Sequence, residues 1–213
     1  MIRKYLAEEY GLNKQNTDNY YYSKLRDEIN VFNVQFPYIS TTFENRKIVS
    51  LSKDLHQLAR EGDPLNITNE KMLTVQRYVI SNNMKQLRNN KNVENITYEQ
   101  AVTYYPNNNK NIMKELCDQK RIVGFIECGE ICGIGIITRS YKMFNEVSIH
   151  VKENYRRKGI GKQLLNELLR ITLSGRKLLV YITELKNQQS IELIQGFEPL
   201  FLIQEEMIYR KII

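Results

Sequence analysis

A strand, a basic loop with two glycines and an apolar helix are expected to follow one another between residues 145 and 175. Apolar and polar side chains first alternate, with Val147, Ile149 and Val151 on one face, as in a half-buried strand. The loop "RRKGIG" comes next, at residues 156–161. The helix then carries one apolar stripe and ends near Gly175; the stripe is Ile160, Leu164, Leu165 and Leu168. This succession predicts an α/β fold in which the helix packs beside its strand.

The segments on either side extend this prediction to a sheet. A second apolar run, residues 177–183, follows the helix, and a strand–helix–strand crossover makes its two strands parallel neighbours. Before residue 145, two apolar runs flank Gly129-Glu130, which predicts an antiparallel hairpin. A short helix ending at Gly196 and a final strand complete this part of the chain.

The glycine loop does not fit two common nucleotide motifs. The dinucleotide fingerprint needs a third glycine where the chain has Leu164, and a P-loop needs glycine at Arg156 and Ser or Thr at Gln163. A helix that begins near Gly159 nevertheless presents free backbone N–H groups and the positive end of its dipole. Glycine lets an anion approach these groups closely, and the neighbouring cations add charge. The loop therefore predicts a pyrophosphate site; the alternative is a solvated basic turn before an ordinary amphipathic helix.

Arg156-Arg157-Lys158-Gly159-Ile160-Gly161 matches the pattern Arg/Gln-x-x-Gly-x-Gly/Ala, five residues after Val151 at the end of a strand. With its strand and helix, this segment resembles the acetyl-coenzyme A motif of the GNAT N-acetyltransferase superfamily. The preceding hairpin, the following strand and the residues Asn187, Gly196 and Phe197 also occur in that family's order. The resemblance covers about residues 113 to 210. It implies a mixed, mostly antiparallel central sheet with a splayed parallel strand pair and flanking helices.

Residues 1–110 are expected to form a separate N-terminal segment, and residues 111–213 the acetyl-CoA-binding core. The N-terminal segment has an uncertain fold that we expect to be mainly helical, with a short strand at 47–52 and a helix ending at Gly62. Apolar spacing predicts a further helix over 68–87, capped by Thr68. Thr97 and Gln100 have the spacing of a capping box.

The resemblance also implies a function. Relatives hold acetyl-CoA and transfer its acetyl group to a primary amine by direct attack in a ternary complex, and the N-terminal segment contributes to the acceptor site. The implied acetyl-CoA-binding residues are Ile149, His150, Val151, Arg156, Arg157, Lys158, Gly159, Ile160, Gly161, Lys162 and Asn187. Five tyrosines either line the acceptor site or pack as surface and core residues: Tyr20, Tyr21, Tyr22, Tyr104 and Tyr105.

Glu146 is the candidate general base, on the strand face opposite Val147. Its spacing from the glycine motif differs by about one residue from the family's usual base, which a bulge would compensate; the alternative is a solvated glutamate. Many relatives place a tyrosine general acid where this chain has Glu192. A second function therefore remains open: a catalytically weak or inactive acyl-CoA-binding module.

The charge and composition of the chain limit the classes of partner and the cellular environment that we expect for it. The net charge of +7 suits an anionic ligand or serves solubility. The cations gather at one turn rather than along a face, so no nucleic-acid partner is expected. No apolar run reaches the ~18 residues of a membrane helix. The cysteines are odd in number, without a nearby histidine, which favours a reducing cytoplasm and no metal site; they are Cys117, Cys128 and Cys132. The expected partner is a small-molecule or peptide amine that accepts the acetyl group, and no membrane partner is expected; the identity of that amine and a homodimer both remain open.

Overall fold

The computed structural model describes residues 2–12, 19–32, 34–62, 65, 67, 72–80, 92–197 and 200–212, and the side chains of all of these except residues 200–203. The chain groups into two compact units. The first holds Met1–Tyr78, Ile182–Gln188 and Leu202–Ile213, and the second holds Val79–Tyr181 and Gln189–Phe201. The second unit contains the strand, glycine loop and helix that were predicted between residues 145 and 175.

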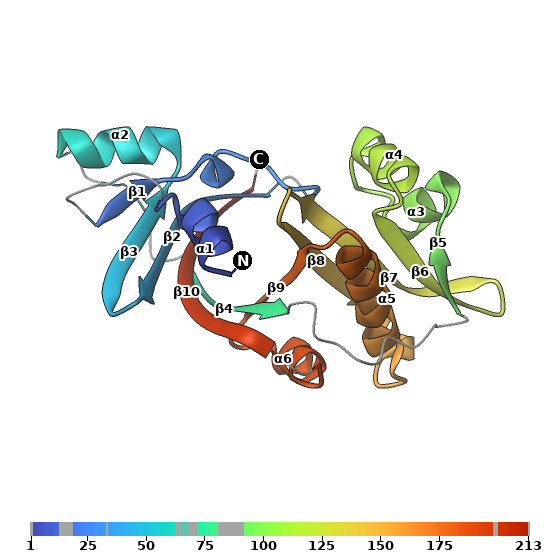
Figure 1. Cartoon of the computed structure of the whole chain (residues 1–213). Helices are drawn as coiled ribbons and strands as arrows, with labels where there is room; N and C mark the ends of the chain where they lie inside the picture. The colour runs from blue at the N-terminus through green and yellow to red at the C-terminus, as the bar shows by residue number, and fades with distance from the viewer. Residues whose placement is uncertain are drawn as a thin grey trace. The chain divides into compact units, whose positions relative to one another are not determined.

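The first unit is built mainly from strands (Figure 1). Its elements are α1 (Ile2–Tyr10), β1 (Tyr20–Tyr22), the short 3-10 helix η1 (Lys24–Arg26), β2 (Val34–Phe43), β3 (Arg46–Leu51), α2 (Lys53–Glu61), most of β4 (Met72–Ile80) and most of β10 (Leu200–Ile212). Their strand order is β1-β3-β2-β10-β4. β1 pairs parallel with β3, whereas β2 pairs antiparallel with both β3 and β10.

The expectation of a mainly helical N-terminal segment was wrong. The predicted strand at 47–52 and the helix ending at Gly62 are confirmed as β3 and α2, but the segment predicted as a helix over 68–87 contains strand β4. Thr68, the predicted cap, lies outside the described residues. The apolar spacing of this segment fitted a helix, but Val75, Val79 and Ile80 are β-branched and are buried in a strand.

A buried ionic cluster joins α1, β4 and β10 inside the first unit. Arg77 donates to Glu206 through Nε (2.6 Å) and Nη2 (3.0 Å), and Nη2 also contacts Glu9 at 3.0 Å. Tyr10 donates to Glu206 at 2.5 Å, and Arg26 pairs with Glu9. Burial by itself lowers the pKa of Arg77, but the two carboxylates outweigh it and hold that pKa well above its usual value. The guanidinium therefore stays charged in the core.

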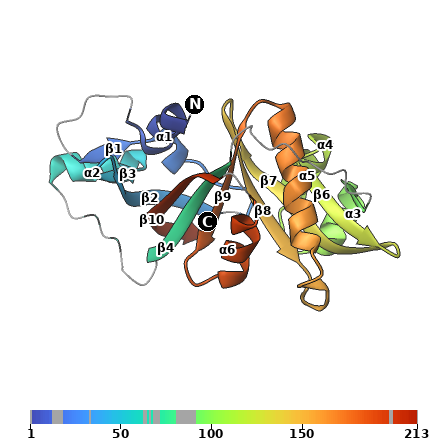
Figure 2. The ribbon, with the colours of Figure 1, turned by 60° about the horizontal axis from the view of Figure 1, so that its bottom comes forward.

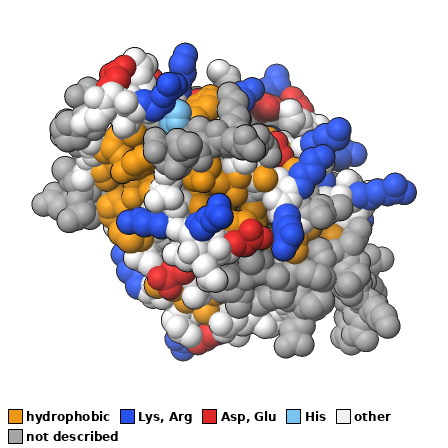
Figure 3. Space-filling view, turned by 60° about the vertical axis from the view of Figure 1, so that its left-hand side comes forward, with side chains coloured by type: hydrophobic (Ala, Val, Ile, Leu, Met, Phe, Trp, Pro, Cys, Tyr) orange, Lys and Arg blue, Asp and Glu red, His pale blue; other side chains and the backbone are white. Residues whose placement is uncertain are grey.

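The first unit also exposes apolar side chains. The large exposed ones are Tyr20, Ile29, Met207, Leu185 and Ile212. Figure 3 brings the side with α2 and β3 forward and shows hydrophobic side chains gathered there, with Lys and Arg side chains around them. Apolar atoms contribute much of the surface of an ordinary soluble domain, so these side chains carry no functional assignment.

The second unit contains a mixed sheet between helices (Figure 2). Its elements are β5 (Val93–Asn95), α3 (Tyr98–Tyr104), α4 (Lys110–Asp118), β6 (Ile122–Glu127), β7 (Glu130–Ser140), β8 (Phe144–Val151), the 3-10 helix η3 (Glu153–Tyr155), α5 (Ile160–Ser174), the first part of β9 (Leu178–Glu184) and most of α6 (Gln188–Gln195). The strand order is β9-β8-β7-β6-β5, antiparallel throughout except for the parallel pair β8 and β9. The predicted mostly antiparallel sheet with one parallel pair is confirmed.

Local signals in this unit were predicted well. The predicted hairpin between β6 and β7 turns at Cys128 and Gly129, one residue earlier than expected, with left-handed φ values of 51° and 79°. Thr97 and Gln100 form the predicted capping box of α3. The apolar stripe of α5 is buried, as its spacing predicted.

The two faces of β8 meet different helices. A Cβ on Gly133 would lie 3.1 Å from Leu164, so β7 and β8 pack closely against α5 on this face. Val151 is paired with Gly133 and shares this face. His150, the next residue along the strand, points to the other face and contacts Tyr104 of α3. The sheet therefore lies between α5 and α3.

The described helices include none that is both long and apolar enough to cross a membrane.

Candidate functional site: an uncapped helix beside an open strand edge

The first turn of α5 lacks the side-chain cap that other helices in this chain have. Ser52, Thr97 and Asn109 accept hydrogen bonds from the first turns of α2, α3 and α4. The N-cap of α5 is Gly159, with φ 77°, and no side chain caps this turn. The positive φ suits glycine, and the first amides of the helix are left as donors for another group.

The space around these donors is open. A Cβ on Gly159 would meet nothing within 4 Å, and one on Gly161 would lie 3.4 Å from Leu193 and 3.9 Å from Val151. The first bond within the helix joins the Gln163 amide to the Gly159 carbonyl at 3.2 Å. Backbone donors before Gln163 can therefore meet a phosphate closely, and the cradle fits the pyrophosphate of a coenzyme A.

Four exposed cations surround this turn: Arg156, Arg157, Lys158 and Lys162. Arg156 Nε donates to the Val151 carbonyl at 3.3 Å, and Lys158 Nζ lies 4.9 Å from the centre of the Tyr155 ring. Arg157 has a φ of 61°. The sequence therefore placed the basic residues correctly around the helix terminus, where their charge adds to that of the dipole.

Glu130, at the start of β7, fixes the loop between β8 and α5. Its carboxylate accepts hydrogen bonds from Lys152 Nζ and Tyr155 Oη, both at 2.8 Å. The bond from Lys152, followed by that from Tyr155, holds the pKa of Glu130 below its usual value. The two hydrogen bonds to Glu130 thus tie the loop between β8 and α5 to the start of β7 and hold it near the N-terminus of α5.

The pairing of β8 with β7 extends farther along the strand than its pairing with β9. With β7, the pairing continues to Gly133↔Val151. With β9, the register begins at Phe144↔Leu178 and ends at Val147↔Tyr181. Among the described residues of the second unit, no strand pairs with Ile149 or Val151 on the β9 edge.

The backbone groups of Ile149 and Val151 face that open edge. The Lys152 amide donates to the Cys132 carbonyl in β7 at 2.9 Å. Alternate residues of a strand direct their N–H and C=O groups to opposite edges, so those of Ile149 and Val151 point away from β7. An extended arm of a ligand can pair there as an added strand would.

His150 lies between these two residues and is contacted by two tyrosines of the α3 end. The Tyr104 hydroxyl is 2.9 Å from His150 Nδ1, and the ring centroids of Tyr104 and Tyr105 lie 5.6 and 6.1 Å from that of His150. The sequence named both tyrosines as lining or packing residues but did not pair them with His150. The only sequence signal that bore on this contact was the predicted capping box, which marked where α3 begins.

Glu146, the predicted base, lies on the β8 face opposite Val147 and is 7% exposed. Its Oε1 is 3.4 Å from the Thr138 hydroxyl, and its Oε2 is 3.8 Å from Arg139 Nη1. The register shifts between Ile137 and Arg139, so the bulge lies in β7, beside Glu146, rather than in β8. The catalytic role of Glu146 stays a prediction.

Two further residues lie around α6. Asn187 belongs to the first unit, where its amide donates to the Glu184 carbonyl at 2.9 Å. Its predicted contact with the coenzyme stays a prediction. Glu192, at the position where the family resemblance leads to the expectation of a tyrosine, lies on α6 in the second unit. In the part of the chain that the structure describes, no group of three His, Cys, Asp or Glu side chains is arranged to hold a metal ion.

Known proteins share this architecture. An acetyltransferase of the GNAT family from Colwellia psychrerythraea superposes with a TM-score of 0.53 at 14% identity, over 73% of this chain and 63% of its own. A Drosophila protein gives a TM-score of 0.54 at 14% identity, over 75% and 60%. The chain thus covers less than two thirds of either structure, and at this identity the likeness shows the fold alone. No match was found among curated proteins.

A family model adds evidence from the sequence itself. Residues 83–197 match the model of the acetyltransferase (GNAT) family, a span of more than half of the chain. The match includes the open edge of β8, the glycine loop and α5, which are the elements of the site described above. The chain belongs to the GNAT family of acetyltransferases.

Proposed function

We propose that this protein transfers an acetyl group from acetyl-CoA to a primary amine, by direct attack of the amine within a ternary complex. The observation that carries the proposal is the uncapped N-terminus of α5, which opens beside the unpaired edge of β8. The amides of the first turn and the loop cations bind the pyrophosphate, and the backbone of Ile149 and Val151 binds the pantetheine arm. Family membership supports acetyl-CoA as the donor.

Acetyl-CoA supplies an activated thioester, and the chain supplies the groups that position it. An N–H group at the open β8 edge is oriented to stabilise the oxyanion that forms on the thioester carbonyl. Binding both reactants in one site makes the attack effectively unimolecular. Glu146, which the sequence predicts as the base for the acceptor amine, lies on the β8 face that also carries His150.

Acetyl-CoA at 100 times its dissociation constant is expected to raise the melting temperature by about 5–10 °C. Gly161→Trp is expected to abolish this shift, because an indole at the first turn of α5 blocks the approach to the backbone amides. Gly161→Ala is the matched control for folding, since a Cβ there makes only ordinary contacts, 3.4 Å to Leu193 and 3.9 Å to Val151. Differential scanning fluorimetry measures all three proteins; no stabilisation of the wild type at millimolar acetyl-CoA would refute the proposal.

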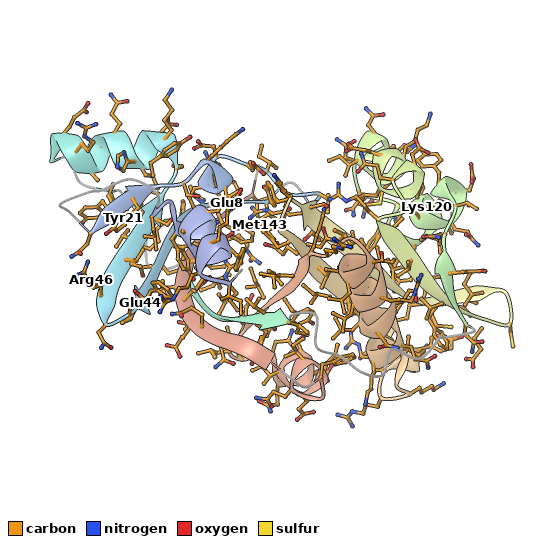
Figure 4. The ribbon with its side chains drawn as sticks, viewed as in Figure 1. Glu8, Tyr21, Glu44, Arg46, Lys120 and Met143 are labelled. Carbon is orange, nitrogen blue, oxygen red and sulfur yellow. The ribbon has the colours of Figure 1, made fainter. Side chains whose placement is uncertain are left out.

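Lys158→Glu is expected to weaken acetyl-CoA binding about tenfold, because a charge-assisted contact contributes about 1.5–3 kcal/mol and salt screens an exposed one. Lys120→Glu is the control, with the same charge change at the exposed turn after α4 (Figure 4). Isothermal titration calorimetry at two salt concentrations measures both variants. Equal losses of affinity would show that net charge, rather than the loop, governs binding.

A second function has its own support. Glu146 is held in a buried ion pair, and Glu192 stands where relatives carry a tyrosine acid. Both features suit an acyl-CoA-binding module without turnover. Release of free thiol with a panel of amines separates the two functions: stabilisation by acetyl-CoA without thiol release from any amine favours the module.

A further inference from the structure

The Tyr104–His150 pair is a cluster of titratable groups that the predicted catalytic residues leave out. Tyr104 Oη lies 2.9 Å from His150 Nδ1 and 3.4 Å from the His150 carbonyl oxygen. The two rings meet edge to face, at an interplanar angle of 76°. α3 thus ends against the open part of β8, and a side chain from each element contributes to one hydrogen-bonded pair.

We propose that His150 carries a proton from the attacking amine to the departing thiolate, and that Tyr104 is the residue that positions it. This inference rests on the proposed acetyl transfer. His150 lies between Ile149 and Val151, whose backbone groups face the unpaired edge where a thioester would bind. The side chain is exposed, so a ligand can reach it.

Glu146 is less well placed to exchange protons with a ligand. Glu146 is 7% exposed, and its carboxylate lies 3.8 Å from the guanidinium of Arg139, which is itself buried. A ligand therefore reaches this carboxylate less readily than it reaches the exposed His150.

The surroundings of His150 favour the neutral imidazole. Partial burial, and then the positive charge of Arg156, lower the pKa of His150 below its usual value. Lys152 Nζ lies 5.5 Å from the Tyr104 ring centre and is paired with the Glu130 carboxylate at 2.8 Å. Burial, followed by the neighbouring Cys132, raises the pKa of Tyr104 to about 12, so the phenol stays protonated. The centre of the Tyr105 ring lies 6.1 Å from that of His150, and burial raises the pKa of Tyr105 as well.

A base at Nε2 requires the tautomer in which Nδ1 carries the proton, and both contacts of Tyr104 are compatible with it. In that tautomer the Tyr104 hydroxyl donates to the His150 carbonyl oxygen, and its oxygen accepts the Nδ1–H of the ring. Nε2 is left with its lone pair and can accept a proton. Tyr104 therefore acts through His150, by holding both its orientation and its tautomer.

The proton transfer balances without a further reactant. The lone pair of the amine forms the N–C bond while the carbonyl π electrons move to oxygen, and the nitrogen gives its proton to Nε2. The tetrahedral intermediate then re-forms the carbonyl and breaks the C–S bond, whose electron pair stays on sulfur. Nε2 returns the proton to sulfur, giving the amide, the free thiol and neutral His150.

The first test follows the imidazole directly, because the chain contains only two histidines. NMR titration of the ring protons, assigned with His150→Gln, is expected to give His150 a pKa below the usual 6.5. Tyr104→Phe is expected to lower it further, since the imidazolium loses an acceptor for its Nδ1–H. Tyr98→Phe, at the other end of α3, is the control and is expected to leave the titration unchanged. An unchanged or higher value in Tyr104→Phe overturns the assigned tautomer and with it the proposal.

The second test uses thiol release with an amine that the wild type accepts. His150→Gln is expected to lower kcat about 10²–10⁴-fold, the usual contribution of a general base, while the acetyl-CoA melting shift persists. Tyr104→Phe is expected to move the acid limb of the pH–rate profile to lower pH, as in the NMR titration. Wild-type turnover with full activity and an unchanged profile in His150→Gln overturns this inference alone. A wild type that acetyl-CoA does not stabilise overturns the proposed function as well.

Discussion

Replacing Arg77 by methionine is expected to lower the free energy of unfolding by about 3–5 kcal/mol, as when one partner of a buried ion pair is lost. Arg77 is 1% exposed and donates to Glu206, Glu9 and the Tyr5 hydroxyl. Without it, the carboxylate of Glu206 stays in the core with only the Tyr10 hydroxyl as a remaining donor among the bonds of this cluster. Denaturant unfolding followed by circular dichroism measures the loss.

The double variant Arg77→Met/Glu206→Met separates lost charge pairing from lost packing. It removes the charged pair together and keeps the Arg26–Glu9 pair, so it is expected to recover much of the stability. A loss below about 1 kcal/mol in the single variant, the size of an exposed ion pair, would contradict the buried cluster. A double variant less stable than the single one would show that packing around the ions matters more than their charge.

Gly11→Ala is expected to lower the free energy of unfolding by about 2–5 kcal/mol. Gly11 follows α1 with φ 76°, a geometry that costs an ordinary residue about 1–2 kcal/mol. A Cβ there would also lie 2.0 Å from the Tyr22 carbonyl oxygen, so the backbone has to shift, and overpacking adds about 1–3 kcal/mol.

Gly62→Ala is the matched control for this prediction. Gly62 has φ 79°, but a Cβ at this position would meet nothing within 4 Å. Its alanine variant is therefore expected to show the conformational cost alone. Thermal and denaturant unfolding compare the two variants; equal losses would mean that the close approach of Gly11 to Tyr22 contributes nothing.

The second unit was predicted well because its signals are local. Alternation along β8 and the stripe of α5 each specify one buried face, and the glycine loop is contiguous in sequence. Such patterns depend on period and turn chemistry, which a sequence displays directly. The position of the glycine loop before an uncapped helix was therefore predicted almost residue by residue, whereas its binding of a cofactor stays a prediction.

The first unit was predicted poorly because long-range contacts decide its structure. Arg77 is buried and paired with residues far along the chain, Glu9 and Glu206. β4 is a strand because of such long-range contacts, which the local spacing of apolar residues does not reveal. The Tyr104–His150 pair was missed for the same reason, since α3 and β8 are brought together only by the fold.

The central claim is that the first turn of α5 binds the pyrophosphate of acetyl-CoA. Titration of ¹⁵N-labelled protein with acetyl-CoA, followed by amide NMR, tests it most directly. The amides of Gly159, Ile160, Gly161 and Lys162 are expected to shift together and to saturate, with smaller changes along Ile149–Val151. Saturable shifts confined to other elements, or none at millimolar acetyl-CoA, would contradict the claim.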